Sequence, residues 1–163
     1  MRILFFIFTS FILFSCGNTK WETKNFEGFS IEVPDYLTAS TRLNDAADAQ
    51  FENGVREVYL VVLKETKEEA AGFTFDSYCE VVKENFKKGA DAEIINENHV
   101  KVNSLSSFQF DSFARVEGYE VFYVAGIFES ENNFYQVISW TLKGRKDTYE
   151  ADLRRIVNSL KEI

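Results

Sequence analysis

The sequence of 163 residues contains one histidine, two cysteines and one proline. A single histidine leaves too few partners for an ordinary zinc site or for a catalytic triad. Two cysteines do not make the disulfide framework of a small secreted scaffold. The sequence also lacks the Gly-x-Ser-x-Gly elbow and the glycine-rich loops that hold nucleotide phosphates. We therefore expect no metal, no cofactor and no enzymatic activity.

Basic residues are outnumbered by acidic residues. The sequence has 18 lysines and arginines and 26 aspartates and glutamates, which gives a formal net charge of −8. Nucleic acid phosphates require a basic stripe on the protein that binds them, so we expect no nucleic acid partner. The same acidic balance argues against electrostatic docking on anionic lipid.

The N-terminus combines Arg2 with a short, nearly unbroken apolar run. The run is shorter than the about 20 apolar residues of a membrane-spanning helix, and its layout is typical of a secretory signal peptide. Leu13, Ser15 and Cys16 resemble the lipobox of bacterial lipoproteins, in which cleavage occurs before a lipidated cysteine. This resemblance implies a signal peptide over residues 1–15 and acyl chains, palmitate among them, on Cys16. The alternative is an ordinary secretory signal that is cut after Ser15 and leaves no anchor.

The residue after the predicted lipidation site is Gly17 rather than aspartate. In lipoproteins of the Gram-negative type, this implies transfer to the outer membrane, with the protein on its periplasmic or surface face. The protein would then contact the membrane through its N-terminal lipid anchor. One short acyl chain binds a membrane only marginally, whereas several chains together hold a protein there firmly.

Hydrophobic periodicity predicts strands and helices in one domain. Apolar and β-branched residues at a period of two predict strands over residues 29–33, 58–63, 93–102, 108–115, 119–128 and 134–142. Apolar residues at helical spacing predict helices over residues 75–88 and 148–161.

The expected boundaries of these elements come from turn and cap residues. Thr74 and Asp147 are suitable N-caps, and Gly89 suits the end of the first helix. Pro34 should end the first strand, because proline cannot donate to a sheet ladder. Asn53-Gly54 is a strong hairpin signal.

The predicted organisation is a signal peptide over residues 1–15, a lipidated cysteine and polar tether over residues 16–25, and one domain over residues 26–163. Strands on either side of a helix, closed by a terminal helix, indicate the α+β class with a mainly antiparallel β-sheet flanked by helices. Strands 58–63 and 119–128 are apolar on both faces, so we expect them at the centre of the sheet.

Two short segments resemble a known superfamily. Residues 26–34, Phe-Glu-Gly-Phe-Ser-Ile-Glu-Val-Pro, resemble the opening strand of Mog1p/PsbP-like domains, and residues 156–160, Ile-Val-Asn-Ser-Leu, are similar to their last helix. The order of elements between them fits the α-β-α sandwich of that superfamily, which includes PsbP-like and DcrB-like bacterial lipoproteins. The resemblance implies a small non-enzymatic accessory or binding domain, and it brings no catalytic residues.

Aromatic residues are the remaining unusual feature, at 16% of the sequence. Most should pack in the core. A minority could line a cleft for a hydrophobic ligand, and the candidates are Tyr123, Tyr135 and Trp140. We expect His99 to lie exposed on the polar side of its strand, and Cys79 to be a small buried residue of the first helix.

These observations favour a lipid-anchored, non-catalytic domain of a bacterial cell envelope that binds a protein partner. The alternative is a carrier or sensor of a small hydrophobic ligand in an aromatic-lined cleft. A third hypothesis, a hydrolase, would have to use His99 with a nearby serine or carboxylate.

Overall fold

A computed structural model describes residues 19–163. The predicted signal peptide and its lipidation site, Cys16, lie outside the described residues. Within residues 19–163, no helix is both long enough and apolar enough to cross a membrane.

Seven strands form one antiparallel sheet in the order β3-β4-β5-β9-β8-β7-β6. Their bounds are Thr38–Ala39 (β3), Ala49–Asn53 (β4), Val58–Thr66 (β5), Ala92–Val102 (β6), Leu105–Val116 (β7), Tyr119–Glu129 (β8) and Asn133–Leu142 (β9). Strands β5 and β8 each have a neighbour on both sides, which confirms their predicted central positions. The sheet and its helices also confirm the α+β class.

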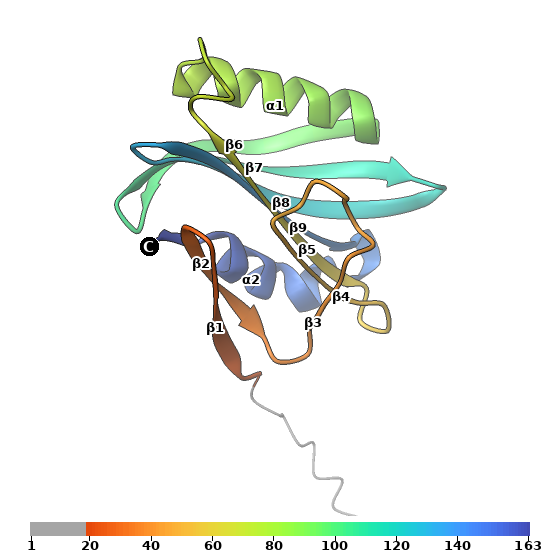
Figure 1. The fold of residues 1–163 in the computed structure, drawn as a ribbon. Coiled ribbons are helices and arrows are strands. Elements are labelled where there is room, and N and C mark those ends of the chain that lie inside the picture. The colour runs from red at the N-terminus through yellow and green to blue at the C-terminus, as the bar shows by residue number, and fades with distance from the viewer. Residues whose placement is uncertain (1–18) are drawn as a thin grey trace, which may run out of the picture.

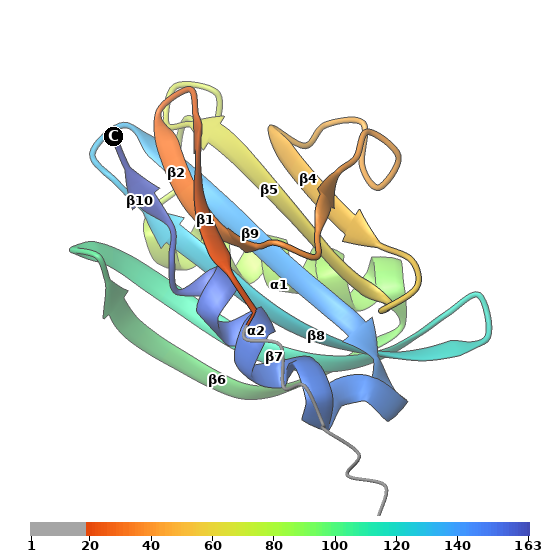
Figure 2. The ribbon, with the colours of Figure 1, turned by 90° about the horizontal axis from the view of Figure 1, so that it is seen from below.

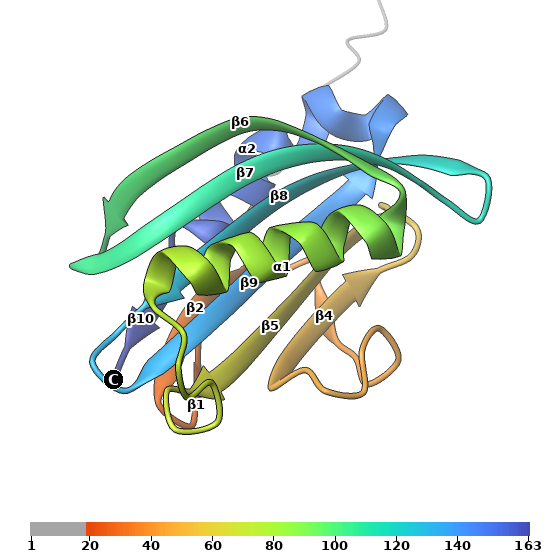
Figure 3. The ribbon, with the colours of Figure 1, turned by 90° about the horizontal axis from the view of Figure 1, so that it is seen from above.

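Helices cover both faces of this sheet, so the domain has three layers (Figure 1). Helix α1 (Phe75–Ala90) crosses one face, as seen from above in Figure 3. Helix α2 (Lys146–Val157) follows the short 3-10 turn Lys143–Arg145 and covers the other face. Beside α2 lies a second sheet, with β2 (Phe29–Pro34) between β1 (Trp21–Phe26) and β10 (Lys161–Glu162); Figure 2 shows this side.

The alternation of side chains along the strands divides the core into two clusters. On β8, Phe122 and Val124 face α2, and Ala125 and Ile127 face α1. Each side therefore has its own apolar core, one per helix, as expected for a sheet that is covered on both faces.

The first helix begins as predicted and ends later. Thr74 accepts a hydrogen bond from the backbone of Ser77, whose hydroxyl in turn accepts from the backbone of Thr74, so the two residues form a capping box. Gly89 lies inside the last turn instead of ending the helix. The left-handed residue that closes α1 is Asp91 (φ 47°), a conformation that short polar side chains tolerate better than most.

The small sheet corrects two sequence predictions. The tether expected through residue 25 is ordered from Trp21, because β1 pairs along its whole length with β2 and Phe26 stacks on Phe29. The terminal helix ends at Val157 rather than residue 161. Ser159 stops it by donating to the carbonyl of Ile156 (2.6 Å) and accepting from the backbone of β2 (2.8 Å), after which β10 pairs with β2.

The N-cap predicted for the last helix was also wrong. Asp147 lies in the first turn of α2, and the residue at the N-cap position is Arg145, which makes no capping hydrogen bond through its side chain. The 3-10 turn that precedes α2 leads the chain directly into the helix.

Candidate functional site

Three aromatic side chains form a row across the large sheet. Trp140 on β9 is the direct partner of Tyr59 on β5 and of Tyr123 on β8. The ring centroids of Tyr59 and Trp140 are 5.3 Å apart, and those of Tyr123 and Trp140 are 5.8 Å apart, both in stacked arrangements. Cross-strand aromatic pairs stabilise a sheet and hold each other's rotamers. The row is therefore rigid, and the pairing register of the strands fixes its position.

The aromatic row lines a pocket of about 420 Å³. This pocket lies near the C-terminal end of α1, where the Phe86 ring meets Tyr123 edge to face at 5.1 Å. Its lining residues come from the β4–β5 loop, the start of β5, the end of β7, the β7–β8 turn, the start of β8 and the end of β9. They are Glu57, Tyr59, Val116, Glu117, Tyr119, Val121, Tyr123, Trp140, Thr141 and Leu142. We call this site the aromatic pocket. Tyr119 is 64% exposed and stands at its rim.

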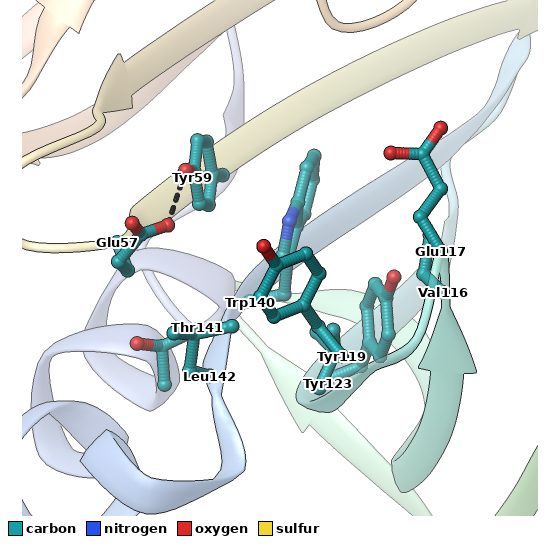
Figure 4. A pocket seen from close by; sticks show the side chains of 10 residues that line it. Glu57, Tyr59, Val116, Glu117, Tyr119, Tyr123, Trp140, Thr141 and Leu142 are labelled. Atoms are coloured by element: carbon teal, nitrogen blue, oxygen red, sulfur yellow. Dashed lines mark hydrogen bonds between the residues drawn. The ribbon is translucent and has the colours of Figure 1, made fainter.

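Two glutamates stand on opposite sides of the aromatic pocket, with Trp140 between them (Figure 4). Glu57 ends the β4–β5 loop, and Glu117 lies in the two-residue turn between β7 and β8. Both have left-handed backbone, with φ of 55° and 51°. This conformation costs a residue other than glycine about 1–2 kcal/mol. Both turns thus place a carboxylate beside the aromatic rings, although the backbone conformation at each glutamate is locally unfavourable.

A hydrogen bond fixes the carboxylate of Glu57. The Tyr59 hydroxyl donates to it at 2.6 Å. Burial, and then this hydrogen bond, raise the pKa of Tyr59 to about 12, so the phenol remains protonated and a donor at neutral pH. The hairpin predicted at Asn53-Gly54 is confirmed, but Asn53 pairs with Val58, so the turn itself spans residues 54–57.

The structure brings together two of the three predicted cleft residues. Tyr123 and Trp140 line the aromatic pocket, whereas Tyr135 is fully buried on the opposite face. Its hydroxyl lies 3.2 Å from the carbonyl oxygen of Gly28 and 3.1 Å from the carboxylate of Glu162. The prediction was wrong for Tyr135 because residues 135 and 140 have opposite parity on one strand and point to opposite faces.

The sequence reasoning did not single out Tyr59, Tyr119 or the two glutamates. Tyr59 carried a usable signal, since it lies in a strand predicted to be central. No sequence signal marked the two glutamates. Their turns come to one pocket only because β5, β9, β8 and β7 pair side by side in the sheet.

His99 does not lie on the face that simple alternation predicts. A bulge in β6 shifts the register between Ile95 and Asn98, and Asn96 adopts a φ of 55°. His99 remains exposed, as predicted, but its ring packs on Phe108 at 4.9 Å on the α1 side.

Cys79 lies near His99, and both line a pocket between α1 and the sheet. Cys79 is 2% exposed, which confirms its predicted burial, and burial raises the pKa of its thiol to about 12. A thiol with so high a pKa is not a nucleophile at neutral pH. In the part of the chain that the structure describes, no group of three or more His, Cys, Asp or Glu side chains is placed to hold a metal ion.

Comparison with known proteins finds similarity at the level of the fold alone. No protein-family model and no curated protein matches the sequence. Among solved structures, the cyanobacterial PsbP (CyanoP) of Synechocystis sp. PCC 6803 is similar, with a TM-score of 0.70 and 14% identity over 91% of this chain and 96% of that one. LpqN of Mycobacterium tuberculosis, described as involved in cell envelope biogenesis, has a TM-score of 0.64 and 10% identity over 89% and 91%. A protein of Bacteroides thetaiotaomicron has a TM-score of 0.59 and 14% identity over 89% of this chain and 48% of its own.

These similarities establish a PsbP-like α+β fold, mostly antiparallel sheet with two helices. At identities this low they establish the fold and no more.

Proposed function

We propose that this protein is a lipid-anchored, non-catalytic accessory domain of the bacterial cell envelope that binds a protein partner through the aromatic pocket. The observation that carries the proposal is the aromatic row Tyr59–Trp140–Tyr123, which stands beside the exposed ring of Tyr119. Tyrosine and tryptophan are enriched at the centres of protein interfaces, where they contribute much of the binding free energy. An aromatic row on a rigid sheet loses little side-chain entropy when a partner covers it.

The anchor follows from the lipobox resemblance at Cys16. The first strand begins at Trp21, so four residues, 17–20, separate it from the anchor at Cys16, and the five residue steps from 16 to 21 span at most about 18 Å. We place the protein at the outer membrane, on its periplasmic or surface face, on the basis of Gly17. The description of LpqN as an envelope-biogenesis protein supports an envelope location for this fold.

A second candidate function is a carrier or sensor of a small hydrophobic ligand. It is favoured by the volume of the aromatic pocket, about 420 Å³, which falls within the range of small-molecule sites. An apolar fluorescent dye that binds the purified domain and is displaced by a lipid extract of the envelope would support it.

The test of the partner-binding proposal is capture from detergent-solubilised envelopes with the full-length protein. Tyr119→Ser removes an exposed ring of the aromatic pocket without opening the core, and Val55→Ser is the matched control, because Val55 is 86% exposed and does not line the pocket. We expect the same co-purifying protein with wild type and Val55→Ser, and at least several-fold less with Tyr119→Ser. Equal recovery with all three proteins would refute binding through the pocket.

A further inference from the structure

We propose that the aromatic pocket receives a basic side chain, lysine or arginine, of the protein partner. This inference rests on the proposed function and adds the chemistry of the group that enters the pocket. It follows from the carboxylates and the aromatic rings that line the pocket. Elsewhere on the domain, groups of both kinds pair with basic side chains.

The two carboxylates of the aromatic pocket have no counter-ion among residues 19–163. Glutamates close by in the sequence do: Glu52 pairs with Arg42 at 2.6 Å, and Glu120 pairs with Lys143 at 2.9 Å. Within residues 19–163, neither Glu57 nor Glu117 forms a salt bridge, and no basic side chain lines the pocket. The pocket therefore holds two carboxylates, and a bound monovalent cation can pair with one of them and be attracted by the other.

In the described part of the chain, the rings of the aromatic pocket also lack a cation. Elsewhere the chain places its own cations over aromatic faces, as with Arg155 over Trp21 at 4.1 Å, Arg56 over Tyr36 at 4.3 Å and Lys146 over Phe122 at 4.9 Å. Among the described residues, no such cation lies over Tyr59, Tyr119, Tyr123 or Trp140. A cation within about 6 Å of an aromatic ring is attracted by its quadrupole, and more strongly when water is excluded.

The remaining lining residues suit the stem of a basic side chain. Val116, Val121 and Leu142 give the aromatic pocket an apolar wall. Lysine and arginine bury their methylene chains along apolar surface and present the charge at the end. In this pocket that charge has Glu57 on one side and Glu117 on the other (Figure 4). An apolar occupant would instead desolvate the carboxylates without pairing them, which is unfavourable. A basic side chain suits the apolar wall and brings a positive charge to the carboxylates.

The experiment uses a five-residue probe peptide, acetyl-Gly-Gly-Lys-Gly-Gly-amide, and the same peptide with norleucine in place of lysine. The indole N–H signals of the protein report binding by NMR, because Trp140 lies in the aromatic pocket and Trp21 lies on the small sheet as an internal control. We expect the lysine peptide at millimolar concentration to shift the Trp140 signal and not that of Trp21. High salt should weaken the binding, and the norleucine peptide should cause no shift.

Charge variants complete the test. Glu57→Gln combined with Glu117→Gln keeps the shape of both side chains and should weaken the lysine peptide about ten-fold, whereas the control pair Glu68→Gln and Glu131→Gln, on exposed loops away from the pocket, should leave it unchanged. Equal binding of both peptides, or unchanged affinity in the pocket variant, would overturn the basic-side-chain inference while the capture result with Tyr119→Ser still stands. If no peptide moves the Trp140 signal, the inference is likewise overturned. Failure of the proposed function itself would appear separately, as unchanged capture with Tyr119→Ser.

Discussion

Gly126 lies in the middle of β8, on the face that α2 covers. A Cβ atom built there would come within 2.7 Å of Val157 Cγ1 on α2 and 2.7 Å of Phe128 Cε2. Both neighbours are fully buried, so neither can move aside without disturbing the core. The absence of a side chain at Gly126 therefore permits the close approach of α2 to β8, one of the strands that carry the aromatic pocket.

We predict that Gly126→Ala destabilises the domain. Overpacking a core costs about 1–3 kcal/mol, and replacing glycine by alanine returns about 0.4–1 kcal/mol through the unfolded chain. The net loss should be about 1–2 kcal/mol, which corresponds to a melting temperature lower by several degrees for a domain of this size. Urea unfolding followed by circular dichroism measures the change, with a lower midpoint and an unchanged slope.

Gly89→Ala is the matched control for this substitution. Gly89 lies inside α1, is exposed, and has no atom within 4 Å of a built Cβ. The same change should therefore stabilise the domain by about 0.5–1 kcal/mol, because glycine is a poor residue in a helix interior. If Gly126→Ala is as stable as wild type, α2 does not pack on β8 as described.

Three further predictions concern the thiol, the pH dependence and the anchor. Because burial raises the pKa of Cys79 to about 12, Ellman's reagent should label it slowly in the native protein and rapidly in urea; fast native labelling would contradict its burial. Hydrogen bonds from Lys146 and then Arg154 lower the pKa of Glu150 below its ordinary value of 4.5, so its contribution to stability is present above about pH 4.5 and is lost as the pH falls through the lowered value. Glu150→Gln should therefore be less stable than wild type at neutral pH, with a difference that shrinks in acid, and a pH-independent difference would be inconsistent with this origin. Cys16→Ser should move the protein from the membrane fraction to the soluble fraction of its host, and retention on the membrane would exclude the lipid anchor.

Local patterns predicted most of the fold, because periodicity and caps act over short distances. The strand that ends at Pro34, the helix that begins after Thr74 and the two central strands are all confirmed. Strand β1 was missed because its polar sequence gains a partner only when it pairs with β2. The early end of α2 depends on Ser159, whose hydroxyl binds a backbone group far away in the sequence.

The candidate site was predicted only in part, because its residues come together through contacts between segments that are distant in the sequence. The density of aromatic residues pointed to Tyr123 and Trp140, and parity along β9 would have removed Tyr135 from the same set. Glu57 and Glu117 lie in separate turns, and only the pairing of β5 with β9 and of β9 with β8 brings those turns to one pocket. Sheet register across several strands is not encoded in any local pattern, so only the structure shows that Glu57 and Glu117 line one pocket.

The most direct test of the central claim is photo-crosslinking in the native host. A benzoylphenylalanine at the position of Tyr119 stands at the rim of the aromatic pocket. One at the position of Val55, a residue that is even more exposed, lies outside the pocket. If the aromatic pocket binds a protein partner, the first position yields one dominant adduct whose crosslinked peptide contains a lysine or arginine, and the second position does not yield it. The same adducts from both positions, or none from the first, would contradict the account.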